Sequence, residues 1–287
     1  AHTVQKKLND LGYKTEITAV KSQGDIILDK PLYELGITGI FTKTLDIAMI
    51  NGQVDIAVHS MKDVPTALPI GIVQAAVLER ANTLDILVHK GNLDFLNGEG
   101  TIATGSLRRQ AQWLNKYPNH KVVDLRGNVN TRMQKLQDSN WSGAVFAAAG
   151  LERINLKPSH YINLDWMIPA PAQGAMVIVA MANDDFCRDA VAELNDIETE
   201  VCTHIERQFL KTLEGGCTAP IGALAIIQED EIVFSGVLFS LDGKEKIEVN
   251  KIVPLEEWKK LGFIAAKEVL DNGGVSLMER IRKDLKK

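Results

Sequence analysis

The sequence predicts an α/β fold of two lobes, followed by a small α+β domain. Three features lead to this prediction. Short apolar runs typical of buried strands alternate with helical patterns up to residue 181. The segment 168–181, IPAPAQGAMVIVAM, crosses back through a proline and glycine turn into a strand, which is typical of a hinge between two lobes. From residue 200 the pattern changes to a helix, three strand-like runs and a final helix, which is typical of an α+β unit.

Composition restricts the classes of protein to which the chain can belong. Its 287 residues predict two or three domains, and its hydrophobic and charged fractions of 45% and 24% are typical of a soluble globular protein. No signal peptide is visible in the sequence, and it has no apolar run of the roughly 18 residues needed to cross a membrane. Three cysteines without metal-ligand spacing favour a reducing compartment, so we expect a cytoplasmic protein. A net charge of -5 gives no overall attraction to nucleic acid or anionic membranes, so any anion site must come from a local cluster of arginines.

The first lobe is predicted to begin with a helix. This amphipathic helix covers residues 1–11, and residues 13–20 alternate like a strand. Residues 24–39 form a glycine-bounded segment with scattered charges, which favours a mobile connection or lid. A second helix follows over residues 41–51, and VDIAVH at residues 54–59 is suited to a buried parallel strand.

Lys62 and Asp63 follow directly after that strand, in the run SMKDVP. Ligands of open α/β sheets bind beyond the carboxyl ends of strands, so this position favours a chemical role for both side chains. The alternative is a solvated Lys–Asp pair in a turn before a proline. The segment by itself does not decide between the two.

Two adjacent arginines mark the first candidate anion site. Further strands are predicted over residues 70–78 and 83–88, and the motif TIATGSLRRQAQ then predicts a strand, a turn at Ser106 and the start of a helix. Arg108 and Arg109 lie in the first turn of that helix, where cations oppose the helix dipole at a cost of up to about 1 kcal/mol. An anion held between them would explain this placement. Ordinary surface arginines are the alternative.

The same arrangement recurs in VVDLRGNVNTRMQKLQ, residues 122–137. A strand leads into a turn at Arg126 and Gly127, and the helix that follows carries Arg132. Guanidinium forks bind carboxylates or phosphates with two parallel hydrogen bonds. Four arginines at two strand-to-helix junctions therefore predict a substrate with several anionic groups.

A third junction adds another arginine, while the motifs of other anion-binding folds are missing. Residues 143–150, GAVFAAAG, predict a strand that enters a helix at residues 151–154, where Arg153 is a further candidate. The sequence has neither G-x-G-x-x-G after a strand nor G-x-x-x-x-G-K-[ST], so it supports neither a dinucleotide fold nor a P-loop. Its six histidines do not cluster at metal spacing, and we expect no metal site.

The C-terminal domain is organised around a cysteine loop. A helix is predicted over residues 200–213 and is ended by a glycine pair, so Cys217 is expected in a tight loop before a strand. In such a loop the thiol can be exposed to a ligand, whereas the alternative is a small buried hydrophobe. The remaining predicted elements are strands over residues 224–227, 232–240 and 247–254 and a helix over residues 255–270.

The chain is similar to the porphobilinogen deaminase family in six segments that occur in order along nearly its whole length. The segments are AVHSMKDVPTALP, TGSLRRQAQ, DLRGNVNTR, AAAGLERI, PAQGA and LEGGCTAPIG. The resemblance implies three domains, made of residues 1–78 with 175–196, residues 82–172 and residues 197–287. It implies that the first two are doubly wound α/β domains like periplasmic binding proteins. The third is then a small α+β domain whose cysteine holds a dipyrromethane cofactor through a thioether.

The resemblance also implies a reaction. The family joins four porphobilinogen molecules head to tail on the dipyrromethane primer, releases ammonia each time, and hydrolyses the product free as hydroxymethylbilane, a step of haem biosynthesis. Loss of ammonia leaves a cationic azafulvene-type electrophile, which a carboxylate beside the pyrrole nitrogen would stabilise. Each porphobilinogen carries an acetate and a propionate, and arginine forks are suited to bind them.

The resemblance assigns roles to individual residues. Asp63 matches the catalytic aspartate, which also contacts the cofactor, and Cys217 matches the cysteine to which the cofactor is attached. The other implied cofactor contacts are Lys62, Ser106, Arg108, Arg109, Arg126 and Gly127. The implied substrate contacts are Arg126, Arg132, Arg153 and Gln173.

Some positions depart from the family pattern. The family has a strand before the first helix, and we expect that this segment is missing from the sequence. Thr38, Thr44 and Gly105 stand where lysine, glutamate and serine are common, and Pro171-Ala172 replaces a common Val-Gly. These departures concern the lid and the hinge rather than the reaction.

Porphobilinogen and the growing pyrrole chain are the expected partners. We expect a monomer that binds neither nucleic acid nor membranes. The alternative function is a non-catalytic, two-lobed binding protein for a polycarboxylate anion. Such a protein would need neither Cys217 nor Asp63.

Overall fold

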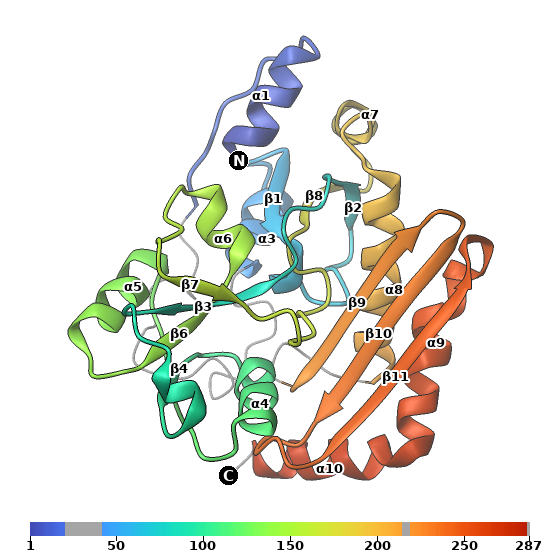
Figure 1. The fold of residues 1–287 in the computed structure, drawn as a ribbon. Coiled ribbons are helices and arrows are strands. Elements are labelled where there is room, and N and C mark those ends of the chain that lie inside the picture. Colours follow the sequence, from blue (N-terminus) through green and yellow to red (C-terminus); the bar gives the residue numbers. More distant parts are fainter. Residues whose placement is uncertain (21–41, 214–218, 286–287) are drawn as a thin grey trace.

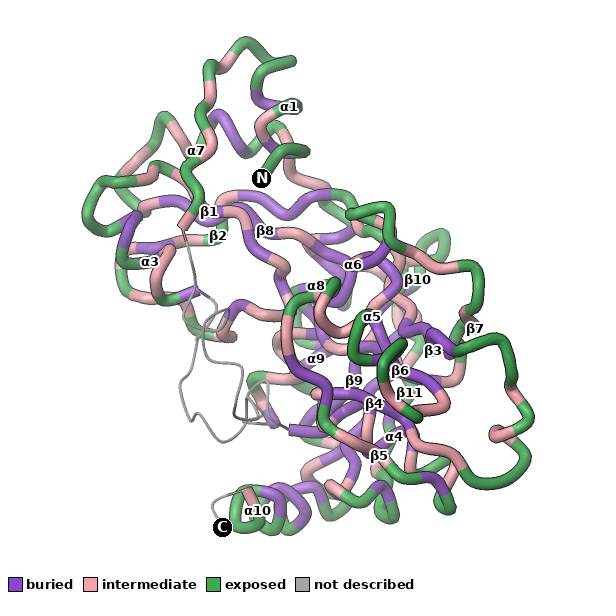
Figure 2. Tube along the Cα trace, turned by 90° about the vertical axis from the view of Figure 1, so that its left-hand side faces the viewer, coloured by how far each residue is buried: buried purple, intermediate pink, exposed green. Residues whose placement is uncertain are grey.

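The computed structural model describes residues 1–20, 42–213 and 219–285, which contain three β-sheets with helices packed against them (Figure 1). Buried residues gather along the central strands, and exposed residues lie along the outer helices and loops (Figure 2). None of the helices in the described residues is both long and apolar enough to cross a lipid bilayer.

The first sheet has the strand order β1-β8-β2 and carries helices on both faces. Its strand β8 runs antiparallel to both neighbours, and its alternate residues Val177 and Ile178 belong to different hydrophobic clusters. The Ile178 cluster includes residues of α1 and α7, and the Val177 cluster includes Met49 of α3. The elements are β1 (Ile56–Ser60), β2 (Ile72–Val77), β8 (Met176–Met181), α1 (His2–Asp10), α3 (Lys43–Ile50) and α7 (Asp185–Ala192).

The second sheet has the order β5-β4-β6-β3-β7. Strand β4 is parallel to β5 and β6, whereas β3 is antiparallel to β6 and β7. Leu136 of α5 and Leu151 of α6 pack in one cluster of this sheet, and Trp113 of α4 packs in another. The elements are β3 (Asp85–His89), β4 (Thr101–Ala103), β5 (Lys121–Val123), β6 (Gly143–Ala147), β7 (Tyr161–Asn163), α4 (Leu107–Lys116), α5 (Val129–Asp138) and α6 (Ala148–Arg153).

The third sheet is an antiparallel meander in the order β11-β10-β9. One continuous core joins it to α8, α9 and α10, with Phe209 and Phe234 in edge-to-face contact at a centroid distance of 5.3 Å. The elements are β9 (Ile221–Gln228), β10 (Glu231–Phe239), β11 (Lys246–Pro254), α8 (Ile197–Thr212), α9 (Trp258–Val269) and α10 (Val275–Asp284).

This architecture confirms the predicted α/β class with a separate small C-terminal α+β unit. Three local predictions were wrong. The strand predicted over residues 54–59 as parallel pairs antiparallel with β8, and residues 13–20 form no strand. The final helix does not end the fold, because a further helix, α10, begins after a kink at Gly273, whose φ is 102°. The predicted lid over residues 24–39 lies within residues 21–41, which are outside the described residues.

Candidate active site

Lys62 and Asp63 lie in a single 3₁₀ turn, Met61–Asp63, that follows β1 directly. Buried Met61 anchors this turn in the core of the first sheet, and its backbone N–H donates to the carbonyl of Ala175 at 3.0 Å. The Lys62 Nζ donates to Gln173 Oε1 at 3.3 Å. Burial lowers the pKa of Lys62 from 10.5 to about 8, although Asp63 raises it. Lys62 is thus only partly exposed and has a side-chain partner, which differs from a fully solvated Lys–Asp pair.

Gln173 lies in a turn whose backbone conformation is unfavourable for most residues. Ala172 has φ 62° and Gly174 has φ 88°, and a Cβ at Gly174 would lie 2.5 Å from the carbonyl oxygen of Ala81. The Gln173 side chain is fully buried and its Nε2 donates to Thr83 O at 2.8 Å and to Asp85 Oδ1 at 2.9 Å. Gln173 thus links Lys62 on the first sheet to Asp85 on the second.

Asp85 is a site residue that the sequence analysis missed. It is the first residue of β3 and is fully buried. Arg109 donates to its Oδ1 through Nε at 3.0 Å and Nη2 at 2.7 Å, and Arg108 Nη1 lies 2.7 Å from its Oδ2. Burial alone would raise the pKa of Asp85, but Arg108 and Arg109 outweigh it and hold the pKa well below its usual value. The available signal was a single carboxylate inside the apolar run TLDILVH.

The arginine pair is buried, so the alternative of ordinary surface arginines is wrong. Only 4% of Arg108 and 7% of Arg109 is exposed. Besides Asp85, Arg108 binds the carbonyl of Ile168 at 2.8 Å and Arg109 binds that of Val145 at 3.2 Å. Much of their hydrogen-bonding capacity is therefore taken by the protein itself.

Ser106 and Gly127 shape the two predicted strand-to-helix junctions, and both junctions are confirmed. Ser106 is the N-cap of α4, and its hydroxyl accepts a hydrogen bond from the Arg109 N–H at 3.4 Å. Gly127 has φ 112°, and a Cβ there would lie 2.8 Å from the Thr131 side chain. Its carbonyl accepts from Arg132 Nε at 2.6 Å, which holds the guanidinium of Arg132 against the turn.

Positive charge accumulates between these elements. Desolvation lowers the pKa of Arg132, Arg109 and Arg126 lower it further, and Asp63 opposes them. Residues from the turn after β1, from α4 and from α5 thus act on one another electrostatically. Arg126 is 6% exposed, and its Nε has no hydrogen-bond partner among the described residues. An incompletely satisfied cluster of guanidinium groups fits a bound polycarboxylate such as dipyrromethane.

One predicted site residue, Arg153, is not brought into this cluster, and another lies outside the described residues. Arg153, the last residue of α6, is exposed, and its charge acts on the amino group of Ala1. Cys217 lies outside the described residues, as does Thr38. Burial is the main cause that raises the pKa of Cys187 to about 12 and that of Cys202 to about 11. Because thiols with a high pKa form little thiolate at neutral pH, these two are poor nucleophiles.

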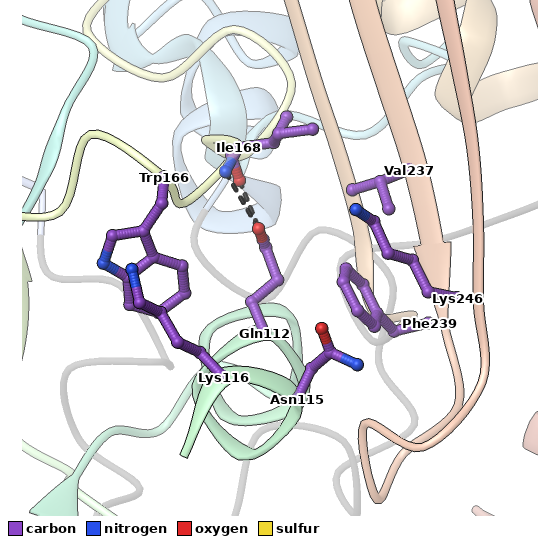
Figure 3. A pocket seen from close by; sticks show the side chains of 8 residues that line it. All are labelled: Gln112, Asn115, Lys116, Trp166, Ile168, Val237, Phe239 and Lys246. Carbon is purple, nitrogen blue, oxygen red and sulfur yellow. Dashed lines mark hydrogen bonds between the residues drawn. The ribbon is translucent and has the colours of Figure 1, made fainter.

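A separate cavity of about 190 Å³ lies at the other end of α4, against the third sheet (Figure 3). Its polar groups already have protein partners. Gln112 binds both the N–H and the carbonyl of Ile168, and Asn115 donates to Gly243 O at 2.8 Å. The Lys116 Nζ lies 4.4 Å from the ring centroid of Trp166. These contacts describe a joint between α4 and the third sheet rather than a second active site.

Known proteins similar to this chain identify its family. Residues 1–189 match the protein family described as "Porphobilinogen deaminase, dipyromethane cofactor binding domain", and residues 200–271 match "Porphobilinogen deaminase, C-terminal domain". Curated relatives named porphobilinogen deaminase include one from Desulfitobacterium hafniense, 39% identical over 100% of this chain and 94% of its own length. Another, from Chlorobium phaeobacteroides, is 37% identical over 93% of this chain and 88% of its own. Among solved structures, an amino-acid transporter binding protein from Bacillus subtilis has a TM-score of 0.42 at 13% identity over 67% of this chain and 78% of its own. On the family matches and the sequence identities, the chain belongs to the porphobilinogen deaminase family.

Proposed function

We propose that this chain is a transferase that joins four porphobilinogen molecules into hydroxymethylbilane on a dipyrromethane primer, with Asp63 as its catalytic carboxylate. Family membership supports the reaction and the cofactor. The observation that supports the residue roles is the position of the Lys62–Asp63 turn beside a surplus of arginine charge. A chain of pyrroles that gains two carboxylates with each ring needs such a surplus.

Asp63 is suited to the cationic stage of the reaction. When ammonia leaves porphobilinogen, positive charge develops on the pyrrole, and a fixed carboxylate in a partly desolvated site stabilises that charge. The same carboxylate can exchange a proton with the leaving amine or with the pyrrole ring. Asp63 is half-buried and is close enough to Arg132 to oppose the lowering of the pKa of Arg132, so it lies near an arginine that we assign to substrate carboxylates.

The arginines divide into two groups. Arg108 and Arg109 are held by Asp85. They therefore contribute fixed positive charge to the site, and their guanidinium groups are less available to bind a carboxylate directly. Arg126 and Arg132 retain more capacity for an anion, and we assign them to the carboxylates of the substrate and the growing chain. Dipyrromethane, when attached at Cys217, supplies the primer on which the chain grows. Lys62, Ser106 and Gly127 complete the proposed cofactor contacts, while Gln173 acts through Lys62.

Arg153 needs a different account. It lies outside the cluster in this structure, so a substrate contact requires a movement of α6 or of the growing chain toward it. We also propose the domain boundaries 1–78 with 175–196, 82–172 and 197–287, a monomeric state and a cytoplasmic location. The three sheets and their separate cores support the boundaries.

The central test is the substitution Asp63→Asn, which preserves shape and removes the charge. We expect porphobilinogen consumption to fall by at least about 100-fold, because one group that stabilises developing charge contributes about 10²–10³ in rate. Asp94→Asn, at the exposed start of another 3₁₀ turn, is the matched control. Intact mass of each protein before and after porphobilinogen reports the cofactor and the number of added rings.

The alternative of a non-catalytic polycarboxylate-binding protein makes an opposite prediction. In that case the parental chain would form no hydroxymethylbilane, its intact mass would show no dipyrromethane, and it would give no colour with Ehrlich's reagent. Normal turnover by Asp63→Asn would instead support the enzyme hypothesis and show that Asp63 is not the catalytic carboxylate.

A further inference from the structure

Helix α8 connects the two turns of the candidate site to the third sheet. It packs in the core of the third sheet, and it also contacts β2 of the first sheet. At its start, the Asp196 N–H donates to Val77 O at 2.7 Å. One and a half turns before the helix ends at Thr212, two adjacent charged residues, Glu206 and Arg207, bind backbone groups of other elements.

Arg207 binds the turn that carries Lys62 and Asp63. Its Nη1 donates to the carbonyls of Met61 at 3.2 Å and Val64 at 3.0 Å, and its Nη2 donates to the carbonyl of Pro65 at 2.6 Å. One guanidinium therefore holds three carbonyls on both sides of Asp63. A planar fork with several donors can do this, whereas a lysine ammonium is a point charge without that fixed geometry.

Glu206 does the equivalent for the turn that carries Gln173. It is fully buried, and its carboxylate accepts from the Ala172 N–H at 2.6 Å and from the Ala225 N–H of β9 at 2.8 Å. Arg80 completes the pairing with two parallel hydrogen bonds of 2.7 and 2.9 Å. Adjacent residues of one helix thus fix both site turns, and the Lys62–Gln173 hydrogen bond joins the two turns directly.

We propose that Arg207 is a positioning residue for catalysis, which sets the placement of Asp63 by holding the carbonyls of its turn. This inference rests on the proposed role of Asp63. We assign Arg207 to the turn and not to substrate carboxylates, because its Nη1 and Nη2 both donate to carbonyls of that turn. A displacement of about 1 Å at a catalytic group can lower a rate about 10²-fold, so loss of the clamp acts on the chemical step.

The test compares Arg207→Lys and Arg207→Ala with the parental holoenzyme. We expect kcat to fall about 10- to 100-fold in Arg207→Ala and less in Arg207→Lys, with KM for porphobilinogen changed less than threefold. Intact mass must show dipyrromethane attached in each variant, and only that fraction is counted. Millimolar methylguanidinium, which replaces the missing fork, is expected to restore part of the kcat of Arg207→Ala.

The matched control is Arg280→Lys, which removes a guanidinium from an exposed pair with Glu245 on the surface of the third domain. It is expected to leave kcat unchanged. The positioning role is overturned if Arg207→Ala keeps kcat within twofold of the parent. It is also overturned if the loss is explained by missing cofactor or a lower melting temperature, with no rescue by methylguanidinium. An inactive parental chain would instead overturn the proposed function, and the inference with it.

Discussion

Asp85 contacts three other residues of the candidate site at once. Arg109 and Gln173 donate to one of its oxygens, and Arg108 lies against the other. A carboxylate removed from water in this way is stable only while its cationic partners remain, and the same holds for the buried arginines. Asp85 therefore sets how much positive charge the site presents to a ligand.

Asp85→Asn is expected to destabilise the folded protein by about 3–5 kcal/mol at pH 7, because it leaves two buried guanidinium groups without their counterion. The folded pKa of Asp85 lies below its unfolded value, so its contribution is complete at neutral pH and is lost as the pH falls below about 4. Urea unfolding at pH 7 and at pH 3.5 measures both effects. Asp185→Asn removes an exposed ion pair with Arg188 and should change little. Equal stabilities of Asp85→Asn and the parent would show that the pair is not needed for folding.

Lys62 predicts a pH dependence of activity. Because its pKa is lowered to about 8, the ammonium loses its charge as the pH rises through and above that value. The expected result is an alkaline limb in kcat/KM at or above pH 8, since anionic ligands nearby can only move it upward. Lys62→Arg keeps its charge and should remove this limb. For stability the sign is opposite, because burying the charged form is unfavourable below pH 8 and this cost disappears between about 8 and 10.5. An alkaline limb that persists unchanged in Lys62→Arg would assign it to another group.

At the scale of elements, the turn before β8 is the most constrained segment of the candidate site. Ala172 and Gly174 both have positive φ, and the backbone of residues 81 and 82 packs directly against Gly174. Ala172 adopts this conformation although a side chain there costs about 1–2 kcal/mol. The hydrogen bond from the Ala172 N–H to Glu206 is therefore formed against a local strain.

Gly174→Ala is expected to destabilise the protein by more than about 2 kcal/mol, since the new Cβ meets backbone atoms and the left-handed conformation is unfavourable for alanine. Gly150→Ala is the control, because Gly150 lies inside the helix α6 and a Cβ there meets nothing within 4 Å. Thermal melting of both variants gives the comparison. Similar melting temperatures for the two variants would contradict the close packing at Gly174.

At the scale of the whole molecule, Glu206 joins units that are far apart in the sequence. It receives Arg80 and Ala172 near the first sheet and Ala225 of the third sheet. Four hydrogen bonds converge on one fully buried carboxylate, so the orientation of the third sheet depends on its charge and shape. The sequence signal for Glu206 was a carboxylate that directly follows Ile205, a buried apolar residue of α8.

Glu206→Gln is expected to cost about 3–5 kcal/mol of stability, because glutamine leaves Arg80 without its counterion and replaces one acceptor with a donor. Glu268→Gln, which breaks an ion pair with Lys251 on the surface, is expected to cost no more than about 1 kcal/mol. Denaturant unfolding followed by calorimetry distinguishes a general loss of stability from separate melting of the third sheet. A cost below 1 kcal/mol for Glu206→Gln would show that the joint does not depend on this charge.

The sequence by itself determined the local elements and the types of residue that meet a ligand. The helix at 41–51, the two strand-to-helix junctions and the C-terminal meander follow from period, turn residues and caps, which are local properties. It also placed Lys62 and Asp63 after a strand, because that pattern lies within a few residues. The resemblance to a family, carried by motifs such as DLRGNVNTR, then supplied the reaction.

Only the tertiary structure decided which charges meet. Arg108 and Arg109 pair with Asp85, and Lys62 donates to Gln173. Arg207 holds the turn around Asp63. These partners lie between 23 and 146 residues apart in the chain. No local pattern encodes such pairings, because they depend on strand order and direction, and the predicted parallel pairing of β1 was itself wrong. Burial likewise follows from packing, and it converts ordinary-looking arginines into a paired, desolvated cluster. The sequence thus supplies the charged side chains, and the fold sets the distances between them and their pKa values.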